Sequence, residues 1–191
     1  PVMAFLLVEG YHHTSNIKRY ALRLLIFAGI SQVPYWLFLA HEGNVLWTLL
    51  VGLIILYAYD HMNERALFWL IAIGLIGLSA WCDWGILGPI MILMMRVIPD
   101  RRKRIIYPLL LPILSQGCTQ LLTMVATLDV TPLPFALYAL VGCTAAIPLL
   151  LSYNNLRGRP LKYFFYGYYP AHMLILGLAK GLLLNDWTLG N

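Results

Sequence analysis

The apolar residues of this 191-residue chain gather in eight long runs, and short polar segments separate the runs. A membrane-spanning helix requires roughly 20 residues, and lipid offers no partner to unpaired backbone groups, so apolar runs of this kind predict helices. Two runs are short, but Trp81 and Trp84 border them and suit the membrane interface. The pattern predicts an all-α membrane protein, a polytopic bundle of about eight transmembrane segments whose first run is shorter than a full span. The runs cover residues 1–11, 20–39, 45–60, 66–81, 84–99, 105–125, 133–151 and 163–184.

Composition supports a membrane protein over a soluble one. Hydrophobic residues make up 61% of the chain and charged residues 11%, whereas soluble domains average about 45–50% and about 25%. The apolar excess extends along the whole chain, so it does not come from one anchor or a signal peptide. Because no linker or low-complexity block interrupts it, we expect a single integral membrane domain over residues 1–191.

The basic residues alternate between successive loops. The loops of one set carry nearly all of them, and the loops of the other set carry no Lys or Arg. Cytoplasmic loops show this excess, so we expect the basic set in the cytoplasm and the C-terminus outside. The net charge of +5 then reflects orientation and contact with membrane lipids, and it leaves no basic face for nucleic acid. The basic set contains Lys18, Arg19, Arg65, Arg101, Arg102, Lys103, Arg104, Arg157, Arg159 and Lys162.

Neither a disulfide framework nor a metal site is expected. Cys82, Cys118 and Cys143 follow no CxxC or His/Cys ligand spacing. The neighbouring His12 and His13 point about 100° apart on a helix, and the chain has no HExxH motif. We interpret the cysteines as small buried hydrophobic residues.

An ionisable residue within a spanning run indicates a functional site by default, and His172 is the clearest example. It follows Tyr163 by nine residues, so it lies roughly 14 Å into the last run and near the bilayer midplane. Tyr169 shares its helical face, and Pro170 removes a backbone donor beside it. A neutral imidazole oriented by Tyr169 could act as a general base toward an amine or hydroxyl. The alternative is a buried histidine that only bonds a tyrosine in the helix packing.

A second candidate site is basic. Arg19 and Arg23 are four residues apart, so they form a stripe on which guanidinium groups could hold a phosphate. Arg23 could equally extend to the interface with no other role. Basic loops chiefly set topology, but those here could also hold the phosphates of coenzyme A. The loop arginines considered for that role are Arg101, Arg102, Arg157 and Arg159.

The remaining candidates are polar residues near the ends of the runs. Glu9 and His13 are four residues apart and could pair, although a simple polar helix end is the favoured interpretation. Gln32 lies in the second run, and Asn44 and Asp83 lie in the acidic loops. An amine-bearing substrate would meet a favourable field at those loops. We expect Gln32, Asn44 and Asp83 to position the acceptor.

Several segments, in order along most of the chain, resemble the TraX family, named for the conjugation protein that acetylates the N-terminus of F pilin. They are FLLVEGYHHT (5–14), RYALRLL (19–25), ISQVP (30–34), NVLWTL (44–49), DWGILG (83–88) and FYGYYPAH (165–172). The resemblance implies a multi-pass acetyltransferase of the bacterial inner membrane that uses cytosolic acetyl-CoA. It also implies an upstream helix with an Asp-His pair that leads into a Gly-Arg…Phe-Pro segment, and of that segment only Pro1 is present here.

Three hypotheses follow for the function. The first is acetyl transfer from acetyl-CoA, bound at the arginines, to an amine or hydroxyl acceptor, with His172 as the base and a pilin-like protein as one possible acceptor. The second is a small transporter or permease in which the same polar groups line a path. The third is a non-enzymatic membrane assembly factor in which His172 and Arg23 only tie helices together.

Overall fold

The computed structural model describes residues 1–154 and 162–184. Every one of the eight apolar runs forms a helix there, and the described residues contain no strand beyond an isolated bridge between Gly43 and Cys82. The prediction of an all-α membrane protein is confirmed. The helices, with one 3-10 turn (η1) and two π-helical segments (η2, η3), are α1 (Val2–His13), α2 (Ile17–Phe38), α3 (Val45–His61), α4 (Arg65–Leu78), η1 (Ser79–Trp81), α5 (Leu87–Val97), α6 (Lys103–Pro112), η2 (Ile113–Cys118), α7 (Thr119–Thr127), α8 (Leu133–Leu137), η3 (Tyr138–Gly142), α9 (Cys143–Leu151) and α10 (Lys162–Leu184).

Three uninterrupted helices of the described chain are long and apolar enough to cross a membrane. They are α2, the continuous helix Lys103–Thr127 (α6, η2 and α7) and the continuous helix Leu133–Leu151 (α8, η3 and α9). The helices α3, α4 with η1, and α5 are apolar but shorter. The run predicted to begin at residue 84 becomes helical only at Leu87, because a turn precedes it with Gly85 at φ 46°. This positive φ favours glycine over residues that carry a Cβ.

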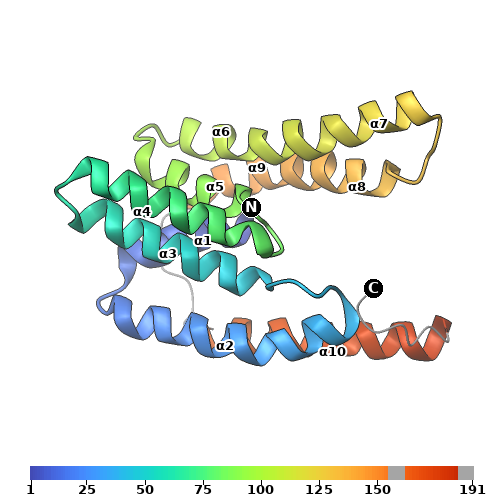
Figure 1. Cartoon of the computed structure of the whole chain (residues 1–191), viewed down its shortest axis with the longest axis horizontal. Helices are drawn as coiled ribbons and strands as arrows, with labels where there is room; N and C mark the ends of the chain where they lie inside the picture. The colour runs from blue at the N-terminus through green and yellow to red at the C-terminus, as the bar shows by residue number, and fades with distance from the viewer. Residues whose placement is uncertain (155–161, 185–191) are drawn as a thin grey trace.

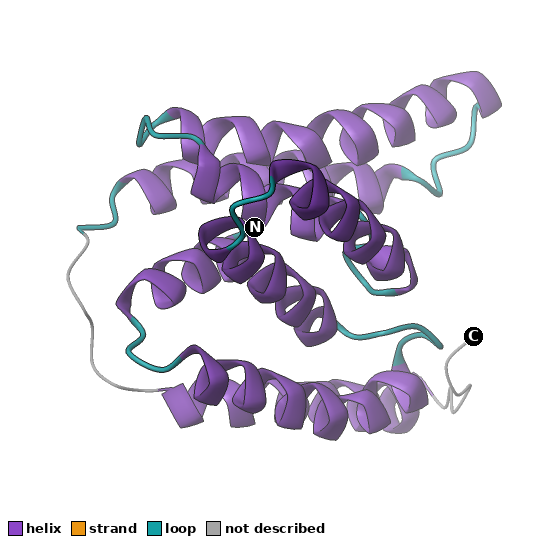
Figure 2. Cartoon of the chain, turned by 60° about the vertical axis from the view of Figure 1, so that its left-hand side comes forward, coloured by secondary structure: helices purple, strands orange, loops and turns teal. Residues whose placement is uncertain are grey.

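The helices lie in three layers. The helices α2 and α10 lie side by side at one edge, α1, α3 and α4 lie in the middle, and the pair formed by α6–α7 and α8–α9 lies at the opposite edge (Figures 1 and 2). The short α5 packs on α1, α3 and α6, whereas α10 packs mainly on α2. The core therefore gathers around α1, α3 and α5, with buried side chains such as Phe5, Leu53 and Met91.

Two glycines bring α3 and α5 into close contact. A Cβ on Gly52 would lie 2.3 Å from the Ile92 Cδ1, and a Cβ on Gly88 would lie 2.3 Å from the Thr48 Cγ2. Small residues at such crossings let membrane helices approach closely, where the gain comes from van der Waals packing. This contact fixes α3 and α5, and with them the loops that precede both helices.

The two sets of loops lie at opposite ends of the molecule. The loops after α1, α3 and α5 lie at one end, and those after α2, η1 and α7 lie toward the other, with the η1 loop nearer the middle (Figure 1). We call the first the basic end, since it carries Arg65, Arg96 and residues 101–104. We call the second the Asp83 end. The alternation of charge along the sequence thus becomes a separation in space; which end faces the cytoplasm stays a prediction.

Candidate functional site

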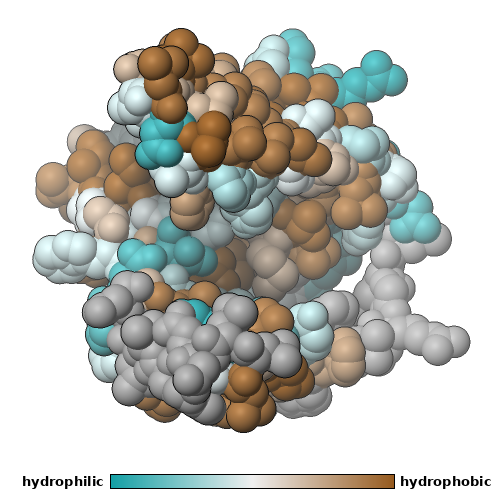
Figure 3. Space-filling view, turned by 90° about the vertical axis from the view of Figure 1, so that its right-hand side faces the viewer, coloured by the Kyte–Doolittle hydropathy of each residue, from teal (hydrophilic) through white to brown (hydrophobic). Residues whose placement is uncertain are grey.

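Two adjoining cavities open near the Asp83 end, and Asp83 and Tyr169 line both of them. The first has a volume of about 300 Å³ and lies among α1, α3 and α5. The second has a volume of about 390 Å³, lies between α2 and α10, and is also lined by His172 and Lys180. Figure 3 looks at this end and shows a hollow between the two halves of the molecule, with hydrophilic side chains at its rim. A carboxylate, a phenol and an imidazole are therefore available to one bound molecule.

Backbone pairing between two loops places Asp83 at the junction of the cavities. The Gly43 N–H donates to the Trp81 carbonyl at 2.8 Å, and the Asp83 N–H donates to the Gly43 carbonyl at 2.7 Å. A Cβ on Gly43 would lie 2.9 Å from the Cys82 Sγ, closer than such atoms approach in proteins. Glycine at residue 43 therefore lets the loop after α2 meet the loop before α5.

The surroundings of Asp83 disfavour its ionised form. Its side chain is accessible from the cavities, but protein atoms replace much of its hydration, and this burial raises the pKa of the Asp83 carboxyl. The negative Glu42 raises the pKa further, and the Tyr35 hydroxyl opposes both effects. Tyr35 also donates to the Glu42 carboxylate at 3.2 Å. A raised pKa in a cavity is typical of groups that bind or transfer protons.

His172 presents one ring nitrogen for chemistry. Its Nδ1 lies 3.0 Å from the Tyr168 carbonyl, and because a carbonyl only accepts, the neutral ring donates from Nδ1 and keeps a lone pair on Nε2. The ring stacks on Tyr168 at 5.0 Å and 8°, and it is tilted by 56° to the Tyr169 ring at 5.4 Å. The hydrogen bond that orients His172 thus comes from the Tyr168 backbone, whereas the sequence had suggested Tyr169.

Gln32 and Asn44 hold the loop after α2 in place. The buried Asn44 side chain caps α3 by accepting from the Leu46 N–H at 3.0 Å, and it donates to the Ala28 carbonyl at 2.8 Å. The Gln32 Oε1 accepts from Asn44 and from the Trp47 indole at 2.9 Å. These contacts give both side chains a structural task; their expected contact with an acceptor stays a prediction.

Arg23 lies between the basic end and the cavities. Its guanidinium lies 5.5 Å from the Tyr20 ring and beside Tyr166 of α10, and its buried Nε has no hydrogen-bond partner among the residues that the structure describes. Tyr166 precedes Tyr169 by about one helical turn. Arg19 is exposed on the same stripe of α2. The structure therefore places Arg23, but not Arg19, within the contact between α2 and α10.

The loop arginines take different positions. Arg101 donates to the carbonyls of Leu151 and Tyr153 at the end of α9, where a cation stabilises the free carbonyls of a helix. Arg102 is exposed. Arg157 and Arg159 lie outside the described residues. A role in holding coenzyme A stays a prediction for all four.

The side chains of Glu9 and His13, whose spacing allowed a pair, do not pair with each other. The His13 Nδ1 lies 2.8 Å from the Glu9 backbone carbonyl, and the Glu9 carboxylate pairs instead with Arg104 at 3.1 Å. Arg104 lies in the first turn of α6, far from α1 in the sequence, so only the folded structure brings it beside Glu9. The described residues hold no group of three or more His, Cys, Asp or Glu side chains arranged for a metal ion.

Sequence reasoning missed a polar cluster at the basic end. The Asp60 carboxylate accepts from Tyr11 at 2.9 Å and pairs with Arg96 at 2.8 Å, which links α1, α3 and α5. Asp60 and Arg96 each lie near the end of an apolar run, where their charges look like ordinary loop charges. Their position inside the runs at 45–60 and 84–99 was the signal that could have identified them.

Comparison with known proteins agrees with the resemblance seen in the sequence. Residues 1–180 match the family described as TraX protein. A relative from Dichelobacter nodosus, described as "Probable fimbrial assembly protein FimC, serogroup H1", is 29% identical over 201 aligned positions, which cover 96% of this chain and 80% of the relative. No solved structure matches the chain.

Proposed function

Because the chain belongs to the TraX protein family, we propose that it is a membrane acetyltransferase that moves an acetyl group from acetyl-CoA to an amine or hydroxyl acceptor. The observation that carries the proposal is the cavity of about 390 Å³ that His172 and Asp83 line together from separate parts of the chain. The acceptor we favour is a pilin-like subunit, since the relative is described as a fimbrial assembly protein.

The side chains at the cavity suit acyl transfer. The free Nε2 of His172 accepts a proton from the acceptor N–H or O–H while the acceptor atom attacks the thioester carbonyl carbon. The new C–N or C–O bond forms, the C–S bond breaks, and coenzyme A leaves as a thiolate that takes up a proton. Asp83 holds an amine acceptor by charge, and Tyr169 lines both cavities and so can contact a reactant in either.

The two ends of the molecule fit two sources of substrate. The basic end attracts the phosphates of cytosolic acetyl-CoA, and the acidic loops at the Asp83 end attract an amine from the other side. In this orientation the protein lies in the bacterial inner membrane with its C-terminus outside. Arg23, beside Tyr166 and without a carboxylate partner among the described residues, lies along the way from one end to the cavities.

The test measures transfer of a radiolabelled acetyl group. The purified chain in proteoliposomes is incubated with labelled acetyl-CoA and with membranes from a strain that lacks its gene, and labelled proteins are separated. A general base contributes roughly 10²–10⁴-fold, so H172A should lose about that much activity while its melting temperature stays unchanged. H41A, which changes an exposed histidine at the same end, should keep full activity. Equal activity in H172A and the unchanged chain would refute the role of His172.

A second function, an assembly role without catalysis, is favoured because the relative is described as a fimbrial assembly protein. It predicts that purified protein transfers no label from acetyl-CoA to any membrane protein. It also predicts that H172A lowers pilus assembly only in proportion to the loss of folded protein. The same experiments therefore separate the two functions.

A further inference from the structure

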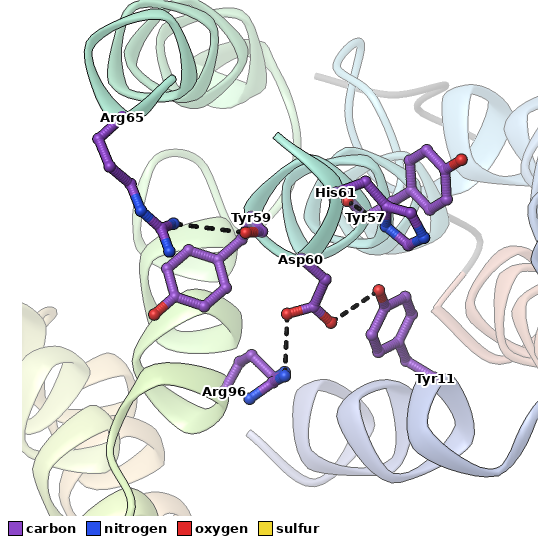
Figure 4. Close-up of polar contacts among 7 residues, drawn as sticks. All are labelled: Tyr11, Tyr57, Tyr59, Asp60, His61, Arg65 and Arg96. Carbon is purple, nitrogen blue, oxygen red and sulfur yellow. Dashed lines mark hydrogen bonds and ion pairs between the residues drawn. The ribbon is translucent and has the colours of Figure 1, made fainter. Parts of the chain in front are cut away.

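Two arginines flank one tyrosine ring at the basic end. The Arg65 guanidinium carbon lies 5.0 Å from the centre of the Tyr59 ring, and the Arg96 guanidinium carbon lies 5.9 Å from it. Arg65 begins α4, Arg96 lies in the last turn of α5, and Tyr59 lies in the last turns of α3 (Figure 4). Three helix ends therefore present two cations to one small area of the surface.

The contacts around these arginines leave positive charge and hydrogen-bond donors unused. Arg96 uses one terminal nitrogen on Asp60, and its buried Nε has no partner. Among the described residues, Arg65 donates to one group, the backbone carbonyl of Tyr59, at 3.4 Å. Asp60 also accepts from the Tyr11 hydroxyl, so its charge is shared with a second donor. Of the two carboxylates near these arginines, Asp60 pairs with Arg96, and the exposed Glu64 forms no ion pair among the described residues, so part of the guanidinium charge stays available.

The start of α4 adds donors to the same place. Its N-cap residue Glu64 makes no side-chain cap hydrogen bond, so the first backbone N–H groups of this 14-residue helix remain free. Free N–H groups and the helix dipole both favour an anion at this position. The exposed Arg65 and the part-exposed Arg96 keep the area open to solvent.

We propose that Arg65, Arg96 and the first turn of α4 form a phosphate-binding site at the basic end. Guanidinium groups bind phosphate through two parallel hydrogen bonds, and the Tyr59 ring holds both of them by cation–π contacts. The phosphate belongs either to coenzyme A or to the head group of an anionic lipid. If it belongs to coenzyme A, the site rests on the proposed function and is the place where the cofactor binds. Arg101, by contrast, uses its donors on the carbonyls of Leu151 and Tyr153.

The experiment uses the full chain in nanodiscs and compares R65Q, R96Q and K18Q. R65Q removes the charge without touching the Asp60 pair, so it keeps the test valid if R96Q unfolds. K18Q is the control, because Lys18 is an exposed cation at the same end. Binding of coenzyme A and of pyrophosphate is measured in neutral lipid, and preference for phosphatidylglycerol is measured by native mass spectrometry.

The expected result is a loss of about tenfold or more in one of these affinities for R65Q, with K18Q unchanged. A loss of coenzyme A and pyrophosphate binding identifies the cofactor as the source, and a loss of bound phosphatidylglycerol identifies the lipid. Binding of all three probes that is equal in R65Q, K18Q and the unchanged chain would overturn the site. Because pyrophosphate and lipid binding need no acetyl transfer, the site can fail or hold independently of the proposed function.

Discussion

The pair formed by Glu9 and Arg104 should stabilise the fold more than the pair formed by Asp60 and Arg96. The Glu9 and Arg104 side chains are 10% and 23% exposed, whereas Asp60 and Arg96 are 22% and 32% exposed. Removing one partner of a buried pair leaves an uncompensated charge and costs about 3–5 kcal/mol. We expect R104Q to cost about 3 kcal/mol, at the lower end of that range, because some water reaches the pair.

The variant R96Q should cost less, about 1 kcal/mol, for two reasons. Its pair is more exposed, and Asp60 keeps the hydrogen bond from Tyr11 after the charge is lost. The double variant E9Q/R104Q should recover most of the loss in R104Q, because two neutral amides can bond each other and no charge remains buried. The difference between R104Q and the double variant thus isolates the cost of the unpaired carboxylate.

The assay is equilibrium unfolding of the purified full chain in bicelles, followed by tryptophan fluorescence, for the single and double variants. Two results would refute the reasoning. One is an equal loss of unfolding free energy in R104Q and E9Q/R104Q, which would mean that the pair carries none of the effect. The other is a larger loss in R96Q than in R104Q, which would mean that exposure does not rank the two pairs.

Two further predictions concern the cavities. Burial raises the pKa of Asp83 in the folded protein, so stability should fall as the pH rises from the ordinary carboxyl pKa through the raised one. The variant D83N should abolish this fall and raise the melting temperature at neutral pH. If the melting temperature of D83N depends on pH as that of the unchanged chain does, the prediction is wrong. A Cβ on Gly177 would lie 2.2–2.5 Å from the Phe38 ring, whereas nothing lies within 4 Å at Gly167 of the same helix. G177A should therefore cost about 1–3 kcal/mol of unfolding free energy and reduce acetyl transfer, and a matched loss in G167A would exclude this contact as the cause.

The sequence was sufficient to predict the helices and the separation of charge. Lipid requires each apolar run to satisfy its own backbone, so hydropathy alone locates helices such as α3 and α10. Because successive helices run in opposite directions, successive loops lie at alternate ends, and the number of helices decides which loops share an end. The boundaries at Leu87 and the π-helical segments η2 and η3 were not predictable in this way. They depend on a glycine turn and on contacts such as Gly117 against Leu140, which join segments far apart in the chain.

The candidate site was predictable only in part. His172 and Asp83 stand out because each is a polar group at the edge of or within an apolar run, and the fold places both at one cavity. The partners could not be predicted from spacing. Glu9 pairs with Arg104, 95 residues away, and Asp60 pairs with Arg96, 36 residues away. Such pairs depend on which helix ends lie side by side in the fold, and this cannot be predicted from the residues next to each other in the sequence.

Because α10 packs mainly on α2, its position determines when during synthesis the cavities become complete. The fully buried side chains of the central core all come from residues before Lys162. His172 and Tyr169, however, leave the ribosome after this core, and they reach the cavities only when α10 packs against α2. An unfinished or truncated chain can thus be inserted and well packed while it has no imidazole beside Asp83. Insertion of α10 is then the step that switches the molecule from a stable membrane bundle to one with a complete pocket.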